Sequence, residues 1–179
     1  INFEFKVKET ENLYVNKINI FGNNITSEAF IRSNLIVDEG DPLNNILQNK
    51  SINNLKAKGI FKSVKYEIKD TDDDLKRNID IYIEEKPTGE ISAGAGYGTD
   101  GSSFFVGIEE NNFNGKGINL ASNLELSENS VRGAIFYTNP NFAYSDRALR
   151  TSIQSTVTDK VKDYGYKTSL NSFSLSFLH

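Results

Sequence analysis

The sequence of 179 residues contains no cysteine and a single histidine, His179, at its last position. Disulfide bonds, thiolate nucleophiles and zinc sites made of cysteine and histidine are therefore excluded, or nearly so, within this chain. A Ser-His-Asp triad is equally disfavoured, because the single histidine that could act as the base is the last residue of the sequence. Any acid–base chemistry would have to come from Asp, Glu, Lys or Tyr side chains.

Long apolar runs are also missing, and the charge is mild. No stretch approaches the roughly 20 apolar residues that a membrane-spanning helix needs. This does not bear on a β-barrel, whose spanning strands have about 9 to 11 residues with only every second one apolar. The formal net charge is -4 and both signs are mixed along the chain. Nothing in the electrostatics indicates nucleic-acid binding, so we expect no nucleic-acid partner.

The first half of the chain predicts a small mixed domain. Residues 14–21 are rich in β-branched side chains and stop at Gly22-Asn23-Asn24, which is typical of a strand that ends in a turn. Two later strands are predicted at 64–68 and 79–83, because apolar and charged residues alternate there, with a polar hairpin loop between them. Two helices separate the first strand from these two. The predicted order is β-α-α-β-β, a sheet covered on one face by two helices.

The two helices have recognisable ends. Thr26 or Ser27 can cap the first helix. The second is predicted to begin with Pro42 in its first turn and to run to about Lys58, with Gly59 as a left-handed C-cap. Its apolar face is predicted to comprise Leu43, Ile46, Leu47 and Leu55.

The pattern changes at residues 87–98. From Ile91 onward, apolar residues alternate with serine and glycine, so a strand would carry an apolar row on one face and almost no side chains on the other. Three interior glycines make such a strand less stable, so their presence needs an explanation.

The rest of the chain keeps a period of two. Six consecutive strands are predicted, at 91–97, 104–109, 118–127, 131–138, 149–157 and 172–177, with Asn111–Gly117 as a turn. Their apolar rows oppose Ser, Asn, Gln, Glu and Arg, which fits a barrel that faces lipid outside and water inside. A soluble antiparallel sandwich or a lipocalin-like barrel gives the same alternation, with the apolar face inward. The pattern alone leaves both open.

Both ends of the chain fall within an alternating pattern, at residues 3–7 and 173–177. We therefore expect the sequence to be part of a longer protein. Residues 1–10 are predicted to end a preceding module.

Three motifs that suggest chemistry have simpler explanations. Gly94–Gly98 is not followed by a helix that could bind a nucleotide phosphate. Asp72–Asp74 lacks the glycine and distal glutamate of a calcium loop. The pairs Glu84-Glu85 and Glu109-Glu110 are neighbours on strands, so their carboxylates point to opposite faces. We expect no enzyme activity, no metal site and no cofactor.

Several stretches resemble a known family. Residues 15–23, Gly40-Asp41 and residues 55–64 closely resemble a POTRA domain. Residues 84–98 are similar to the passage from the last POTRA domain into the first barrel strand of the BamA family of outer-membrane protein assembly factors. Asn111–Gly117 and Tyr137–Phe142 resemble two turns of that family, although Asn139 stands where the family usually has an acid.

This resemblance implies an α+β POTRA domain followed by part of an antiparallel transmembrane β-barrel. The implied domains are the end of a preceding POTRA domain (1–10), the last POTRA domain (12–87) and the first barrel strands (88–179). The implied location is the outer membrane of a Gram-negative bacterium, with the POTRA domain in the periplasm.

The resemblance also implies a function, which is the folding and insertion of β-barrel proteins. Client barrels, accessory assembly lipoproteins and outer-membrane lipid are the implied partners. A POTRA-barrel translocation pore that secretes a dedicated partner is the alternative, and a soluble two-domain binding protein is a third possibility.

The predicted sites are strand edges and surfaces. The first barrel strand must close on the last, so it forms the seam and is expected to offer its backbone to a client strand. Its residues are Ile91, Ser92, Ala93, Gly94, Ala95, Gly96 and Tyr97. The predicted POTRA edge strand includes Lys62, Val64, Tyr66 and Ile68, whose flanking lysines equally fit protection against aggregation. The predicted lipid-facing residues are Ile118, Leu120, Leu124 and Leu126.

Overall fold

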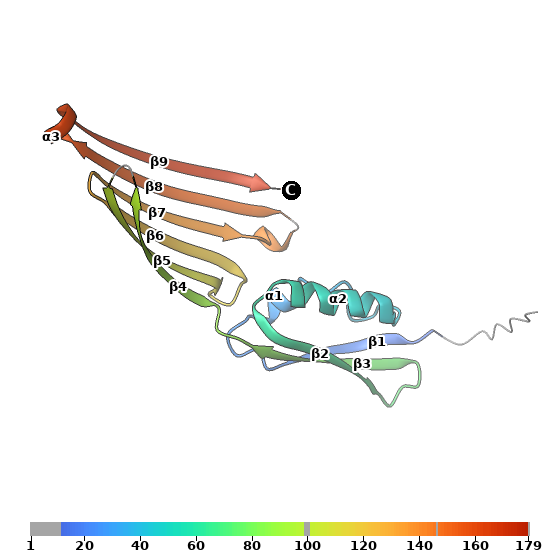
Figure 1. Cartoon of the computed structure of the whole chain (residues 1–179). Coiled ribbons are helices and arrows are strands. Elements are labelled where there is room, and N and C mark those ends of the chain that lie inside the picture. The colour runs from blue at the N-terminus through green and yellow to red at the C-terminus, as the bar shows by residue number, and fades with distance from the viewer. Residues whose placement is uncertain (1–11, 99–100, 146, 179) are drawn as a thin grey trace, which may run out of the picture. The chain divides into compact units, whose positions relative to one another are not determined.

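The computed structural model describes residues 12–98, 101–145 and 147–178, which divide into two compact units (Figure 1). Within the described residues, the first unit comprises the chain up to Asn24 together with Asn34–Glu85. The second comprises Ile25–Ser33 and the chain from Lys86 onward. The module end predicted at residues 1–10 lies outside the described residues.

The first unit is a three-stranded sheet with one long helix. Its strands are β1 (Tyr14–Phe21), β2 (Phe61–Asp70) and β3 (Lys76–Glu85), and its helix is α2 (Asn45–Ala57). The sheet order is β1-β3-β2, with β3 parallel to β1 and antiparallel to β2. The short helix α1 (Glu28–Arg32) precedes α2 in the sequence and clusters with the second unit. The predicted order β-α-α-β-β is confirmed.

The core of the first unit contains the apolar row of β3. Ile79, Ile81 and Ile83 are at most 6% exposed. A register shift between Val15 and Ile18 of β1 leaves both of these side chains buried, although they are three residues apart. This bulge explains why the alternation in the first strand is imperfect.

Two polar side chains determine where the helices begin. Ser27 caps α1, as predicted, and its Oγ accepts a hydrogen bond from Phe30 N at 3.3 Å. The predicted start of α2 is wrong, because Asn44 is its cap and Pro42 lies before the helix, in an isolated bridge with Tyr14. An asparagine that accepts two backbone N–H bonds satisfies more of the first turn than a proline can. The predicted end of α2 is confirmed, since Lys58 is the C-cap and Gly59 has a φ of +71°.

The predicted apolar face of α2 is also wrong in part. Ile46 is 79% exposed, whereas Leu55 is fully buried. With the helix phase set by Asn44, the positions that face inward follow helical spacing. They are Gln48, Ser51, Ile52 and Leu55.

The second unit contains α1 and a six-stranded antiparallel sheet. Its strands are β4 (Gly89–Gly98), β5 (Gly101–Phe113), β6 (Ile118–Ser127), β7 (Ser130–Asn139), β8 (Ala148–Lys160) and β9 (Tyr166–Leu178). The connections include η1 (Phe142–Tyr144) and α3 (Val161–Tyr164). Each strand pairs with the next, which confirms the six consecutive strands (Figure 1). β5 runs three residues into the turn predicted at Asn111, with a register shift between Glu110 and Phe113.

The register keeps the two faces of this sheet chemically distinct. Directly paired residues lie on the same face. Apolar residues meet across neighbouring strands, as at Phe104–Leu126, Ile135–Ile153 and Ile153–Phe173. The pairs Glu125–Arg132 and Gln154–Ser172 lie on the opposite face. No helix in the described part of the chain is long and apolar enough to cross a membrane.

The burial of α2 can be tested with two leucine-sized side chains. Leu55→Ala should lower the free energy of unfolding by about 2 to 5 kcal/mol, because it removes a buried side chain and leaves a cavity. Ile46→Ala should change it by less than about 0.5 kcal/mol, because Ile46 is exposed. Urea unfolding of residues 12–87 measures both changes. Equal losses for the two variants would contradict the observed helix phase.

Candidate functional site

Strand β4 forms one edge of the six-stranded sheet. It pairs with β5 from Gly89–Glu110 to Gly98–Gly101, and no other described strand pairs with its far side. In an antiparallel strand paired on one side, every second residue points its backbone N–H and C=O away from the partner. The outer edge of β4 therefore presents a row of donors and acceptors that fits one further strand.

The apolar face of β4 is uncovered. Its residues are Ile91, Ala93, Ala95 and Tyr97, which pair with Ile108, Val106, Phe104 and Ser102. Ile91 and Tyr97 are 78% and 86% exposed. The seven residues predicted from sequence, 91–97, thus all lie in this edge strand.

The opposite face of β4 is shaped by an aromatic ring that the sequence analysis did not single out. Gly94 pairs with Phe105, and a Cβ atom at Gly94 would lie 2.2 Å from Phe105 Cε1. The ring therefore occupies the space above the glycine, and a side chain at position 94 would have to displace it. Aromatic side chains commonly cover strand glycines in this way. The available signal was an aromatic residue in an otherwise polar row.

The start of β4 is held by side chains at the end of β5. Thr88, which precedes β4, donates a hydrogen bond from Oγ1 to the carboxylate of Glu110. Its carbonyl oxygen accepts from Asn111 N at 3.2 Å. The same Glu110 carboxylate accepts from Asn112 N at 2.7 Å. The sequence pattern assigns no role to Thr88 or Glu110 and places Asn112 only within a turn.

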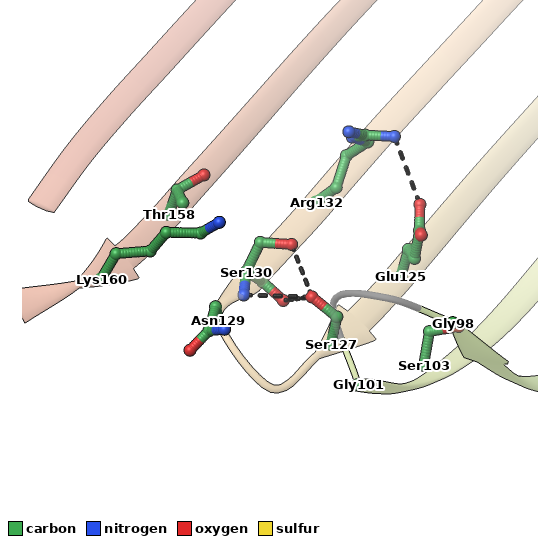
Figure 2. A pocket seen from close by; sticks show the side chains of 10 residues that line it. All are labelled: Gly98, Gly101, Ser103, Glu125, Ser127, Asn129, Ser130, Arg132, Thr158 and Lys160. Atoms are coloured by element: carbon green, nitrogen blue, oxygen red, sulfur yellow. Dashed lines mark hydrogen bonds and ion pairs between the residues drawn. The ribbon is translucent and has the colours of Figure 1, made fainter. Parts of the chain in front are cut away.

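The polar face of the sheet is hollowed near the β6–β7 hairpin. A cavity of about 390 Å³ lies there (Figure 2). Arg132 Nη1 contacts Glu125 Oε2 at 3.3 Å, and the hydroxyls of Ser127 and Ser130 are 2.7 Å apart. The lining residues are Gly98, Gly101, Ser103, Glu125, Ser127, Asn129, Ser130, Arg132, Thr158 and Lys160. These groups make a polar, wettable wall.

Metal-binding residues are not gathered in the described part of the chain. No group of three or more His, Cys, Asp or Glu side chains there could hold a metal ion.

Strand β2 is an edge of the first sheet, as the sequence predicted. Val64 is buried in the core, and Tyr66 Oη donates to Asn49 Oδ1 at 3.2 Å, so neither side chain is available to a partner strand. Lys62 is exposed and forms an ion pair with Glu84. The hydrogen bond from Lys62 lowers the pKa of Glu84, and Glu84 raises the pKa of Lys62.

The predicted lipid-facing row is apolar and exposed only in part. Leu124 and Leu126 are each 44% exposed, and Leu120 is half-buried. Ile118 is 6% exposed, so the prediction that it belongs to an exposed face is wrong. It directly follows Gly117, where a Cβ atom would lie 2.3 Å from the Phe30 ring. The packed environment at this end of β6 explains the burial.

Comparison with known proteins adds sequence evidence. Residues 13–86 match the POTRA family model, described as "Surface antigen variable number repeat". The outer membrane protein assembly factor BamA of Neisseria meningitidis serogroup B is 26% identical over 146 residues, which cover 79% of this chain and 18% of the relative. The same factor of Buchnera aphidicola is 27% identical over 151 residues, covering 83% and 24%. The chain thus spans less than a quarter of the length of these curated relatives.

Solved structures show the same architecture. BamA from Haemophilus ducreyi lacking POTRA domains 1–3 has a TM-score of 0.82 and 27% identity, and the match covers 92% of this chain and 32% of that one. CdiB from Acinetobacter baumannii has a TM-score of 0.61 at 18% identity, covering 93% and 33%, which shows a shared fold alone. The chain is therefore BamA-like, with a POTRA domain followed by the antiparallel strands of a β-barrel-like sheet.

Proposed function

We propose that the protein folds and inserts β-barrel proteins into the outer membrane by pairing the edge of β4 with an incoming client strand. The observation that carries the proposal is an unpaired strand edge in a chain that is 26% identical to an outer membrane protein assembly factor. The protein is located in the outer membrane, and its POTRA domain lies in the periplasm. Client β-barrel proteins and accessory assembly lipoproteins are its proposed partners.

Strand addition suits this edge physically. A client strand would gain backbone hydrogen bonds along β4 and would need no covalent chemistry or nucleotide. The small side chains of Ala93, Gly94, Ala95 and Gly96 leave the backbone accessible to strands of different sequence. Such an edge can accept many clients, because the contacts are made with the main chain.

A second contact is proposed at the edge of β2. We propose that a client or an accessory protein adds a strand beside β2, using the backbone of residues 62–68. The exposed lysines along this strand discourage uncontrolled pairing between copies of the domain, because adjacent like charges repel. Partner binding and protection of the edge are compatible when the partner strand carries acidic residues.

The alternative function is that of a POTRA-barrel pore that secretes a dedicated partner. Crosslinking can distinguish this function from the assembly of client barrels. Cysteines at Ala93 and Ala95 in the full-length protein should crosslink to several different newly made barrel proteins, because both lie on the edge strand. Ser122→Cys is the matched control, since β6 is paired on both sides by β5 and β7. Mass spectrometry of the crosslinked products identifies the partners.

Two outcomes would count against client pairing at β4. Crosslinks confined to the closing strand of the same barrel would mean that the edge only seals the barrel. Crosslinks to one secreted protein would favour the translocation pore.

We also propose that the apolar face of β4–β9 faces lipid. Leu124→Arg in the full-length protein should reduce the yield of inserted barrel, because an arginine near the bilayer midplane costs about 2 to 4 kcal/mol. Asn123→Arg is the control, because its side chain lies on the polar face of the same strand. The heat-modifiable mobility of the folded barrel on a gel measures the yield. Equal yields for both variants would refute the proposed facing.

A further inference from the structure

The turn between β5 and β6 binds a segment from the first part of the chain. Residues 112–117, here called the β5–β6 turn, contact residues 25–33, here called the α1 segment, and both belong to the second unit. Ser27 N donates to Gly115 O at 2.8 Å. Ser27 is also the N-cap of α1, so this bond fixes the start of that helix.

Asn112 is the central residue of this contact. Its Nδ2 donates to Thr26 Oγ1 at 2.9 Å, and its Oδ1 accepts from Gly117 N at 2.8 Å. Asn112 and Thr26 are only 6% and 2% exposed. One end of the amide holds the α1 segment and the other holds the turn, which requires a side chain with both a donor and an acceptor.

Two glycines give the turn its close fit. Gly115 has a φ of +67°, and a Cβ atom there would lie 2.1 Å from Ile25 O. Gly117 has a φ of +62°, and a Cβ atom there would lie 2.3 Å from Phe30 Cζ. Both positions therefore need glycine for conformation and for space. A turn that merely reversed the chain would need only the first of these properties.

The contact continues to the start of β4. Asn112 N donates to the Glu110 carboxylate, which also accepts from Thr88 Oγ1. Thr88 immediately precedes β4. An uninterrupted series of hydrogen bonds thus runs from Thr26 through Asn112 and Glu110 to Thr88.

We propose that Asn112 is a positioning residue for the edge strand. Its side chain binds Thr26 and so holds the β5–β6 turn against the α1 segment. Its backbone N–H, placed by that turn, binds Glu110 and so fixes the start of β4. An edge strand held at one end offers an incoming strand a defined register from that end. This consequence rests on the proposed function, whereas the hydrogen-bonded contact itself does not.

Hydrogen–deuterium exchange of the full-length protein in lipid nanodiscs, without any client, tests the proposal. Asn112→Leu should speed exchange about tenfold in peptides that contain residues 25–33 and 88–92. It removes the buried side-chain bonds to Thr26 and Gly117, and these bonds hold the turn in the position from which the backbone N–H of residue 112 reaches Glu110. Thr26→Val removes only the hydroxyl and should speed exchange at the α1 segment while the Gly117 amide stays protected. Thr26→Ser keeps the hydroxyl and should retain the original exchange.

The controls separate this role from general unfolding. Asn114→Gly is the control within the same turn. Asn114 is exposed and has a φ of +58°, which glycine adopts readily, so this variant should leave exchange unchanged. Peptides from β8 should stay protected in every variant, which shows that the sheet is folded. Unchanged exchange at 25–33 and 88–92 in Asn112→Leu would overturn the proposal. That result would leave crosslinking at β4 unaffected, so failure of the anchor and failure of client pairing are distinguishable.

Discussion

The pairing of β4 with β5 is the constraint on which the rest of the second unit depends. It satisfies one side of the β4 backbone and leaves the other side without a partner among the described strands. An edge of this kind is a hazard in most proteins, because it templates association with other strands. In the function we propose, this unpaired edge is the place where a client strand would pair. The start of this strand is held by the hydrogen bond between Thr88 and Glu110.

Patterns of short range were readable from the sequence. The period of two predicted all six strands of the sheet, because each paired register keeps apolar and polar faces apart. Ser27 was predictable as a cap for the same local reason, since it bonds to Phe30 only three residues away. The start of α2 was mispredicted because two local signals competed there. Proline favours the first turn of a helix, but Asn44 accepts hydrogen bonds from two backbone N–H groups, and the helix therefore begins after Asn44.

Contacts between distant residues could not be read in this way. Thr26 and Asn112 are 86 positions apart, and nothing in the composition of either stretch predicts that they meet. The burial of Ile118 has the same origin. Alternation assigns it to the row of Leu120 and Leu124, but it lies next to a glycine that packs against Phe30. An alternating pattern predicts on which face of a strand a side chain lies. It does not predict which other parts of the chain cover that face at either end.

The glycines of the second unit illustrate why one residue type needed several explanations. The sequence suggested that the glycines weaken β4, the strand expected at the seam of the barrel. At Gly94 the structure adds a specific reason, because the Phe105 ring takes the place of a side chain. At Gly115 and Gly117 the positive φ and the close approach of the α1 segment act together. In β4, glycine leaves the backbone of the edge strand accessible. In the β5–β6 turn, glycine allows the α1 segment to pack closely. The same residue type therefore serves both an accessible strand and the contact that holds the start of that strand.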